Sequence, residues 1–184
     1  MDPVRLNERL VVTVGDITHE DVDAIVNAAN SKLMGGGGVD GAIHAGAGPE
    51  LLEACREVRA TKYPDGLPTG KSVITPGGQL RARHVIHTVG PIYGKHNGEE
   101  PRLLADAYRG AIRLAASHGL KTIAIPAIST GVYGYPKEEA AKIARTAVES
   151  ALQEHPQITE VRMVFFSEKD AKIFLGSGGA APEQ

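Results

Sequence analysis

The chain has 184 residues, 42% of them hydrophobic and 23% charged, and 20 Lys and Arg against 22 Asp and Glu give a net charge of −2. This composition is typical of one globular domain, and it excludes intrinsic disorder, a collagen-like repeat and binding of long nucleic acid by charge alone. The single cysteine, Cys55, excludes an internal disulfide and a cysteine-rich zinc site.

Short apolar runs predict six strands, several of them continuous rather than alternating, as in strands that are buried on both faces. They are Leu10–Val14, Ala24–Ala28, Ser72–Thr75, Val85–Val89, Thr122–Ile125 and Val161–Phe165. Segments with helical spacing of apolar residues lie between them. These are Pro49–Arg59, Pro101–His118, Pro136–Glu154 and Glu168–Leu175. The alternation predicts a three-layer α/β/α domain with a largely parallel central sheet over residues 1–175, and a flexible tail at 176–184.

Glycine is over-represented, and four glycines in a row, Gly35–Gly38, follow the second predicted strand. Glycine allows backbone conformations that are closed to other residues and lets a ligand touch the main chain. The N–H groups of Gly36, Gly37 and Gly38, just before a helix, would form an anion-binding nest. A flexible surface loop is the alternative, although linkers seldom join a buried strand to a helix.

A second loop, 126–136, follows the fifth predicted strand and is also rich in hydrogen-bond donors. Ser129, Thr130 and Gly131 supply N–H and hydroxyl groups at what we expect to be a neighbouring strand end. Two such loops suit a diphosphate held between them. Tyr133 is preferred to Tyr135 as the aromatic that covers a sugar, because flanking glycines leave the Val-Tyr pair free to close.

Four familiar motifs are incomplete. Gly36–Gly41 matches the dinucleotide pattern G-x-G-x-x-G, but the next strand does not end on an acidic residue. Asp65–Ser72 resembles a P-loop, yet it begins with Asp and precedes a strand. Ala127–Gly131 is one substitution from a nucleophile elbow, but its His and Asp would follow in reverse order. His84 and His87 would point to opposite faces of a strand and could not share one ion, so we expect no metal site. We also expect no cofactor.

Polar residues stand at the ends of the first two strands. Asp16 either caps the following short helix or accepts a hydrogen bond from an exocyclic amine. Asparagine is uncommon in strands, so we interpret Asn30 as a residue that binds ribose hydroxyls. Asn27 either binds the ligand or holds the loop in place. Asp40 and His44, four apart, could be a helix cap and a packed histidine. Beside the nest they could instead position a water, with Asp40 as its base or anchor.

Seven short blocks, in order along nearly the whole chain, resemble the MacroD-type macrodomains. They are Gly15–Thr18, Ile25–Asn30, Gly35–His44, Pro68–Gly70, His87–Tyr93, Ile128–Pro136 and Phe165–Glu168. Each block alone is weak evidence for this family, but seven blocks in the same order are highly specific for it. The resemblance implies a single macrodomain with a six-stranded mixed sheet between helices and an ADP-ribose site.

The resemblance also implies where the adenine lies. Asp16 would hold the adenine amine, and the backbone of Ile17 would hold the ring. Phe166, at the end of the last predicted strand, would pack on the adenine, with Phe165 as the fallback. These residues would form one end of the site.

The rest of ADP-ribose is placed in the same way. By resemblance, the glycine loop with Val39 and the segment from Ser129 to Val132 would hold the diphosphate. Asn30 and Asp40 match the positions at the distal ribose, and Tyr133 would cover that sugar. We expect Asn30, Asp40 and His44 to carry the catalysis, although the substrate's own phosphate could activate the water instead of Asp40.

The resembling subgroup hydrolyses ADP-ribose from aspartate and glutamate side chains and deacetylates O-acetyl-ADP-ribose. The expected partners are therefore ADP-ribose and ADP-ribosylated proteins, with ADP-ribosylated nucleic-acid ends as a further substrate. Two alternatives stay open: a reader that binds ADP-ribose without turnover, and a phosphatase that acts on ADP-ribose 1″-phosphate.

The start of the chain lacks the features of a signal peptide, and the longest uncharged stretch, 122–136, is too short to span a bilayer. We expect a cytoplasmic protein without membrane contact, and a monomer.

Overall fold

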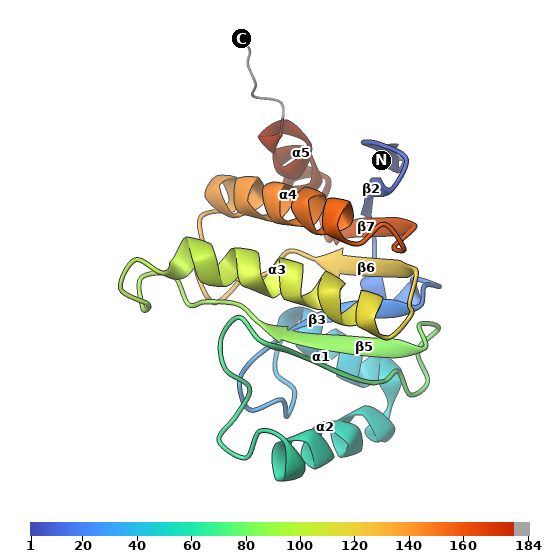
Figure 1. Cartoon of the computed structure of the whole chain (residues 1–184), viewed down its shortest axis with the longest axis vertical. Helices are drawn as coiled ribbons and strands as arrows, with labels where there is room; N and C mark the ends of the chain where they lie inside the picture. Colours follow the sequence, from blue (N-terminus) through green and yellow to red (C-terminus); the bar gives the residue numbers. More distant parts are fainter. Residues whose placement is uncertain (179–184) are drawn as a thin grey trace.

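The computed structural model describes residues 1–178, in which a mixed sheet lies between two layers of helices (Figure 1). The strands are β1 Val4–Arg5, β2 Leu10–Val14, β3 Ala24–Ala29, β4 Ser72–Pro76, β5 His84–Val89, β6 Thr122–Pro126 and β7 Glu160–Phe165. They follow the order β1-β2-β7-β6-β3-β5-β4. The five inner strands are parallel, and the edge strands β1 and β4 are antiparallel to their neighbours. The parallel strands therefore direct their carboxyl ends to one edge.

The six predicted strands are all present, and the sheet has a seventh. The extra strand, β1, has only two residues, and both are exposed. It has no apolar run because it pairs only with β2 at the edge of the sheet and buries neither face. The prediction of six strands was wrong for this reason, whereas the largely parallel three-layer architecture is confirmed.

Among the described residues, five α-helices and one short 3-10 helix cover the sheet. They are η1 Ile17–His19, α1 Gly38–Ala47, α2 Pro49–Thr61, α3 Glu100–Ser117, α4 Lys137–Glu154 and α5 Glu168–Ser177. The last two residues of α5, Gly176 and Ser177, and its C-cap, Gly178, belong to the segment predicted as a flexible tail, whereas 179–184 of that segment lie outside the described residues. Within residues 1–178, no helix is both long and apolar enough to cross a membrane.

The two faces of the sheet are buried against different helices, which explains the continuous apolar runs. Ala24 and Val26 of β3 belong to the core beneath α3, α4 and α5, whereas Ile25 and Ala29 belong to the core beneath α1 and α2. Side chains alternate between the faces of a strand, so a strand covered on both faces needs apolar residues at successive positions. This double cover fixes the strand ends that carry the loops of the site.

Candidate functional site

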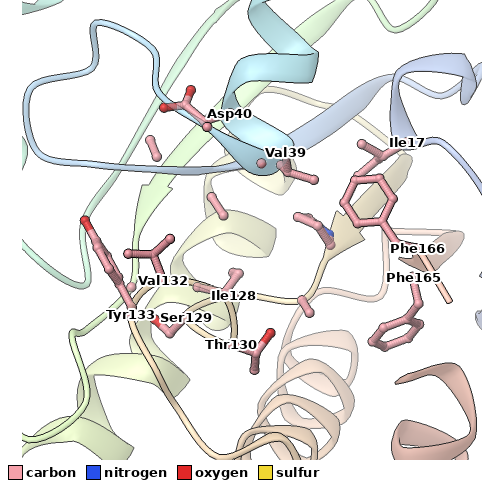
Figure 2. A pocket seen from close by; sticks show the side chains of 18 of the residues that line it. Ile17, Val39, Asp40, Ile128, Ser129, Thr130, Val132, Tyr133, Phe165 and Phe166 are labelled. Atoms are coloured by element: carbon pink, nitrogen blue, oxygen red, sulfur yellow. The ribbon is translucent and has the colours of Figure 1, made fainter. Parts of the chain in front are cut away.

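A cavity of about 520 Å³ opens at the edge where the five parallel strands end (Figure 2). Its walls come from the segments that follow these strands and from the first turns of the next helices. They include Gly15 and Ile17 after β2, 28–30 and 36–40 at and beyond the end of β3, Gly90 after β5, 126–133 at and beyond the end of β6, and 164–166 at the end of β7. This is the place where parallel α/β sheets bind ligands.

The glycine loop forms one wall of the cavity and leads into α1. Gly35 and Gly38 have φ values of +89° and +57°, a backbone conformation that side chains other than glycine rarely adopt. Gly37 is the N-cap of α1, so the N–H groups of the first turn lack partners within the helix. Free N–H groups and the positive end of the helix dipole together attract an anion. The predicted nest therefore lies on the cavity wall.

The loop after β6 forms the opposite wall and is held tightly at both ends. Ile128 N–H donates to Tyr108 Oη over 2.9 Å at its start, and Tyr135 N–H donates to the carbonyl of Ser129 over 2.9 Å. Ser129 has a φ of +69°, and its hydroxyl is buried without a hydrogen-bond partner among the described residues. Val132, at the loop tip, is fully exposed. The loop thus presents donor groups to the cavity from a fixed base.

Asp40 is the third residue of α1 and only 5% of its surface is exposed. Its Oδ1 atom accepts a hydrogen bond of 2.8 Å from Asn27 Nδ2, whereas Oδ2 has no hydrogen bond within residues 1–178. A Cβ atom on Gly36 would stand 3.3 Å from Asp40 Oδ2 and 3.4 Å from Asn30 Nδ2, so these two polar atoms flank Gly36. One carboxylate oxygen is therefore fixed, and the other lies next to Gly36 without a hydrogen bond within residues 1–178.

Asn30 lines the cavity while its side chain shapes the turn after β3. Asn30 Oδ1 accepts from the N–H groups of Lys32 and Leu33 at 3.0 and 3.2 Å, and Nδ2 donates to the carbonyl of Gly35 over 3.2 Å. An amide nitrogen has two hydrogens, so one donor of Asn30 is left for a ligand.

Tyr133 and Asp40 lie at the same end of the cavity, and Ile17 and Phe166 lie at the other (Figure 2). Burial raises the pKa of the Tyr133 hydroxyl, and the negative charge of Asp40 raises this pKa further. The phenol is therefore neutral and can donate a hydrogen bond next to the carboxylate. A loop rich in N–H groups, an acid and a neutral phenol share one end of the cavity.

A comparison with protein families supplies the identity of this fold. The Macro domain family model matches residues 26–144, which include both loops and the segment between them. This chain is a macrodomain.

Two of the macrodomain's relatives carry the name O-acetyl-ADP-ribose deacetylase. The protein of Cronobacter sakazakii is 50% identical over 179 residues, which cover 97% of this chain and 98% of the relative. That of Escherichia fergusonii is 52% identical over 171 residues, covering 92% and 94%. Among solved structures, a variant of the Oceanobacillus iheyensis macrodomain with ADPR has a TM-score of 0.90 and 48% identity, covering 96% of this chain and 95% of that one. The MacroD-type resemblance of the sequence is thereby confirmed.

Most of the predicted site residues of the macrodomain meet at the cavity. Those that line it are Ile17, Asn30, Gly36, Gly37, Gly38, Val39, Asp40, Ser129, Thr130, Gly131, Val132, Tyr133 and Phe166. Phe166 is 66% exposed at the rim, whereas the fallback, Phe165, also borders the cavity but is only 7% exposed and packs on Phe174. Of the two, Phe166 is thus the aromatic side chain that is accessible to a planar ring of a ligand.

Three predicted residues do not line the cavity. Asn27 is fully buried beneath α1, on the face of β3 that it shares with Ile25 and Ala29. His44 lies one helical turn after Asp40, with its Nε2 atom 3.5 Å from Asp40 Oδ1 and without a hydrogen bond among the described residues. Asp16 caps η1, where its Oδ1 accepts from the Thr18 hydroxyl over 2.6 Å and from Thr18 N–H over 2.9 Å. These two hydrogen bonds, that of the hydroxyl first, lower the pKa of the Asp16 carboxyl.

Other lining residues were missed in the sequence. Gly90 follows β5 at the same edge, so its place after a predicted strand was a signal that could have found it. Lys137 and Asp170 lie in the first turns of α4 and α5 and form an ion pair of 2.9 Å at the cavity, a pairing that only the folded chain reveals. In the described part of the chain, no group of three or more His, Cys, Asp or Glu side chains could hold a metal ion.

Proposed function

We propose that this macrodomain binds ADP-ribose and hydrolyses esters of it, namely mono-ADP-ribosyl esters on Asp and Glu side chains and O-acetyl-ADP-ribose. The observation that carries the proposal is the buried Asp40 carboxylate at the cavity, with one oxygen fixed by Asn27 and the other next to Gly36 without a hydrogen bond among the described residues. A pure reader of ADP-ribose has no need for a carboxylate held in this way. The relatives named O-acetyl-ADP-ribose deacetylase, which are 50% and 52% identical in sequence, support an ester-hydrolysing activity.

The cavity accommodates the ligand in the order adenine, diphosphate, distal ribose. Ile17 and Phe166 border the adenine end, with Asp16 close by in sequence to accept the exocyclic amine. The glycine loop and the β6 loop supply N–H donors from both sides for the diphosphate. The distal ribose then falls at the end that holds Asp40 and Tyr133.

Hydrolysis adds one water across the ester. The water oxygen forms a bond to the acyl or anomeric carbon, the carbon–oxygen bond of the ester breaks, and the leaving oxygen receives a proton. Asp40 Oδ2 is free to take the proton that the water loses, and Asn30 can hold a ribose hydroxyl in place. If the substrate's phosphate is the base instead, Asp40 orients the sugar through the same oxygen.

The test is release of acetate from O-acetyl-ADP-ribose and of ADP-ribose from a carrier protein modified on glutamate. The wild type is expected to release far more than one equivalent of product. Asp40→Asn keeps an acceptor for Asn27 but not a base, and it is expected to lower turnover by about 100-fold or more, within the range for a lost general base. Asp21→Asn, an exposed acid close to the amino end of β3, is the matched control and should leave turnover unchanged.

Two results would contradict the proposal. Tight ADP-ribose binding by calorimetry without product release would make the protein a reader, and Asp40 would then serve only the ribose contact. Release of phosphate from ADP-ribose 1″-phosphate, with both esters left intact, would assign the pocket to a phosphatase. The same assay with ADP-ribosylated nucleic-acid ends measures how far the substrate range extends.

A further inference from the structure

His87 is a fully buried histidine in β5 that the proposed chemistry does not use directly. It is the register partner of Asn27 in the neighbouring strand β3. Both side chains lie on the face of the sheet beneath α1 and α2, where the other side chains are mostly apolar. A polar pair in such a place needs hydrogen-bond partners to offset its loss of water.

The hydrogen bonds around His87 fix its tautomer. Asn27 Nδ2 lies 2.8 Å from Asp40 Oδ1 and 3.1 Å from His87 Nδ1. An amide nitrogen only donates, so His87 Nδ1 must accept. The ring proton is therefore on Nε2, which lies 3.0 Å from Thr75 Oγ1.

The His87 ring is also neutral. Burial, with a smaller electrostatic contribution from His44, lowers the pKa of His87 to about 3. The acceptor at Nδ1 is thus available to Asn27 throughout the neutral pH range. The chain of contacts runs from Thr75 through His87 and Asn27 to the carboxylate of Asp40.

The Asn27 amide is held only through its nitrogen. Its oxygen, Oδ1, is buried without a hydrogen-bond partner in the described part of the chain. Each of the two N–H groups has one acceptor, His87 Nδ1 and Asp40 Oδ1. Removal of the acceptor at His87 would leave a buried donor unpaired and free the amide to rotate about χ2, which would shift the hydrogen bond to Asp40.

We propose that His87 is a positioning residue for the hydrolysis: it orients the Asn27 amide, which in turn holds Asp40 with one oxygen free for the water. The inference rests on the proposed function, because it assigns a role in the same reaction. A small displacement of a catalytic group lowers the rate strongly, by about 100-fold for a shift of 1 Å. His87 would act on kcat without touching ADP-ribose.

Two substitutions separate this role from simple packing. In His87→Asn, the amide oxygen can take the place of Nδ1 and accept from Asn27. In His87→Gln, the longer side chain reaches toward Thr75 and leaves Asn27 without its acceptor. Asn is the smaller side chain, so a packing role predicts that His87→Asn suffers more, whereas the positioning role predicts the opposite.

The experiment measures kcat and KM for O-acetyl-ADP-ribose and Kd for ADP-ribose in the wild type and both variants. We expect kcat of His87→Gln to fall about 10- to 100-fold with Kd changed less than about threefold, and His87→Asn to stay within about threefold of the wild type. An unchanged kcat in His87→Gln, or an equal loss in both variants, would overturn the proposal. Thermal unfolding of each variant verifies that it is folded.

A second measurement does not depend on turnover. The side-chain amide hydrogens of Asn27 should be protected from solvent exchange by NMR in the wild type and in His87→Asn, and one of them should lose protection in His87→Gln. Equal protection in all three proteins would refute the link between His87 and Asn27. If the three proteins show this difference in protection but the wild type has no turnover, the proposed function fails while the hydrogen-bond assignment stands.

Discussion

Gly90 lies directly against Ser129: a Cβ atom on Gly90 would collide with the Ser129 hydroxyl and with the Ile128 side chain. The two residues follow β5 and β6, the strands that flank β3, so their contact crosses the carboxyl end of β3. The absence of a side chain at Gly90 thereby allows the β6 loop to sit on the sheet with Ser129 in its left-handed conformation.

Gly90→Ala is expected to push the β6 loop outward. Overpacking of a filled site costs about 1–3 kcal/mol of unfolding free energy, and the displaced donors should weaken ADP-ribose binding several-fold. Urea unfolding and calorimetry measure the two effects. Gly176→Ala is the control, because the added Cβ meets nothing within 4 Å in α5 and should not destabilise the protein. Wild-type affinity in Gly90→Ala would show that the loop does not depend on this contact.

Asp16 has a structural and a proposed binding role, which two substitutions separate. Asp16→Ala removes the cap of η1 and the acceptor for adenine, and it should weaken ADP-ribose binding by about 1.5–3 kcal/mol, the contribution of a hydrogen bond to a charged group. Asp16→Asn keeps an oxygen for Thr18 but replaces the second acceptor with a donor, so it should bind as weakly while unfolding like the wild type. Unchanged affinity of both variants by calorimetry would remove Asp16 from the site.

Phe165 and Phe166 are adjacent but should respond oppositely to alanine substitution. Phe166→Ala removes an exposed ring at the rim and should leave stability unchanged while weakening ADP-ribose binding by about 1–3 kcal/mol, as for a lost base–aromatic stack. Phe165→Ala removes a ring packed on Phe174 and should cost about 3–5 kcal/mol of unfolding free energy. Thermal unfolding and calorimetry on both variants test this division, and a reversed pattern would place the adenine contact on Phe165.

The buried neutral His87 should make stability depend on pH. Its pKa is lowered from 6.5 to about 3 in the folded protein, so between these values the unfolded chain binds a proton that the folded chain does not. Stability contributed by His87 is therefore present above pH 6.5 and is lost as the pH falls, by about 2–3 kcal/mol at pH 4.5.

Urea unfolding at pH 7 and pH 4.5 isolates this contribution when the wild type is compared with His87→Asn. Carboxylates titrate alike in both proteins, so their effects cancel in the difference. The wild type should lose more unfolding free energy on acidification than His87→Asn does. Equal losses would mean that His87 takes up its proton in the folded state.

The sequence predicted the sheet and helices well because the strands are continuous apolar runs between helical patterns. It failed for Val4–Arg5, where two exposed edge residues leave no hydrophobic signal. It predicted the two loops that form the cavity because glycines and donor-rich residues follow buried strands. Strand ends and loop chemistry are local properties of the chain, and they are readable from the chain itself.

The direction in which Asn27 points was not predictable in the same way. Alternation along β3 places Asn27 on the face of Ile25 and Ala29, but the pattern does not say which face a given helix covers. Contacts between distant segments, such as Lys137 with Asp170 or Asn27 with His87, depend on the sheet order and on helix packing. The buried contacts that hold the proposed catalytic side chains in place therefore become visible only in three dimensions.

The sheet order also has a consequence for the chain during its synthesis. β2 lies beside β7, and β3 lies between β6 and β5, so the amino-terminal strands emerge from the ribosome long before their neighbours. Until residues up to Asp170 have been translated, the lining of the cavity is incomplete. The pocket thus forms only after β7 has been translated, and ADP-ribose can stabilise the growing polypeptide only from that point on.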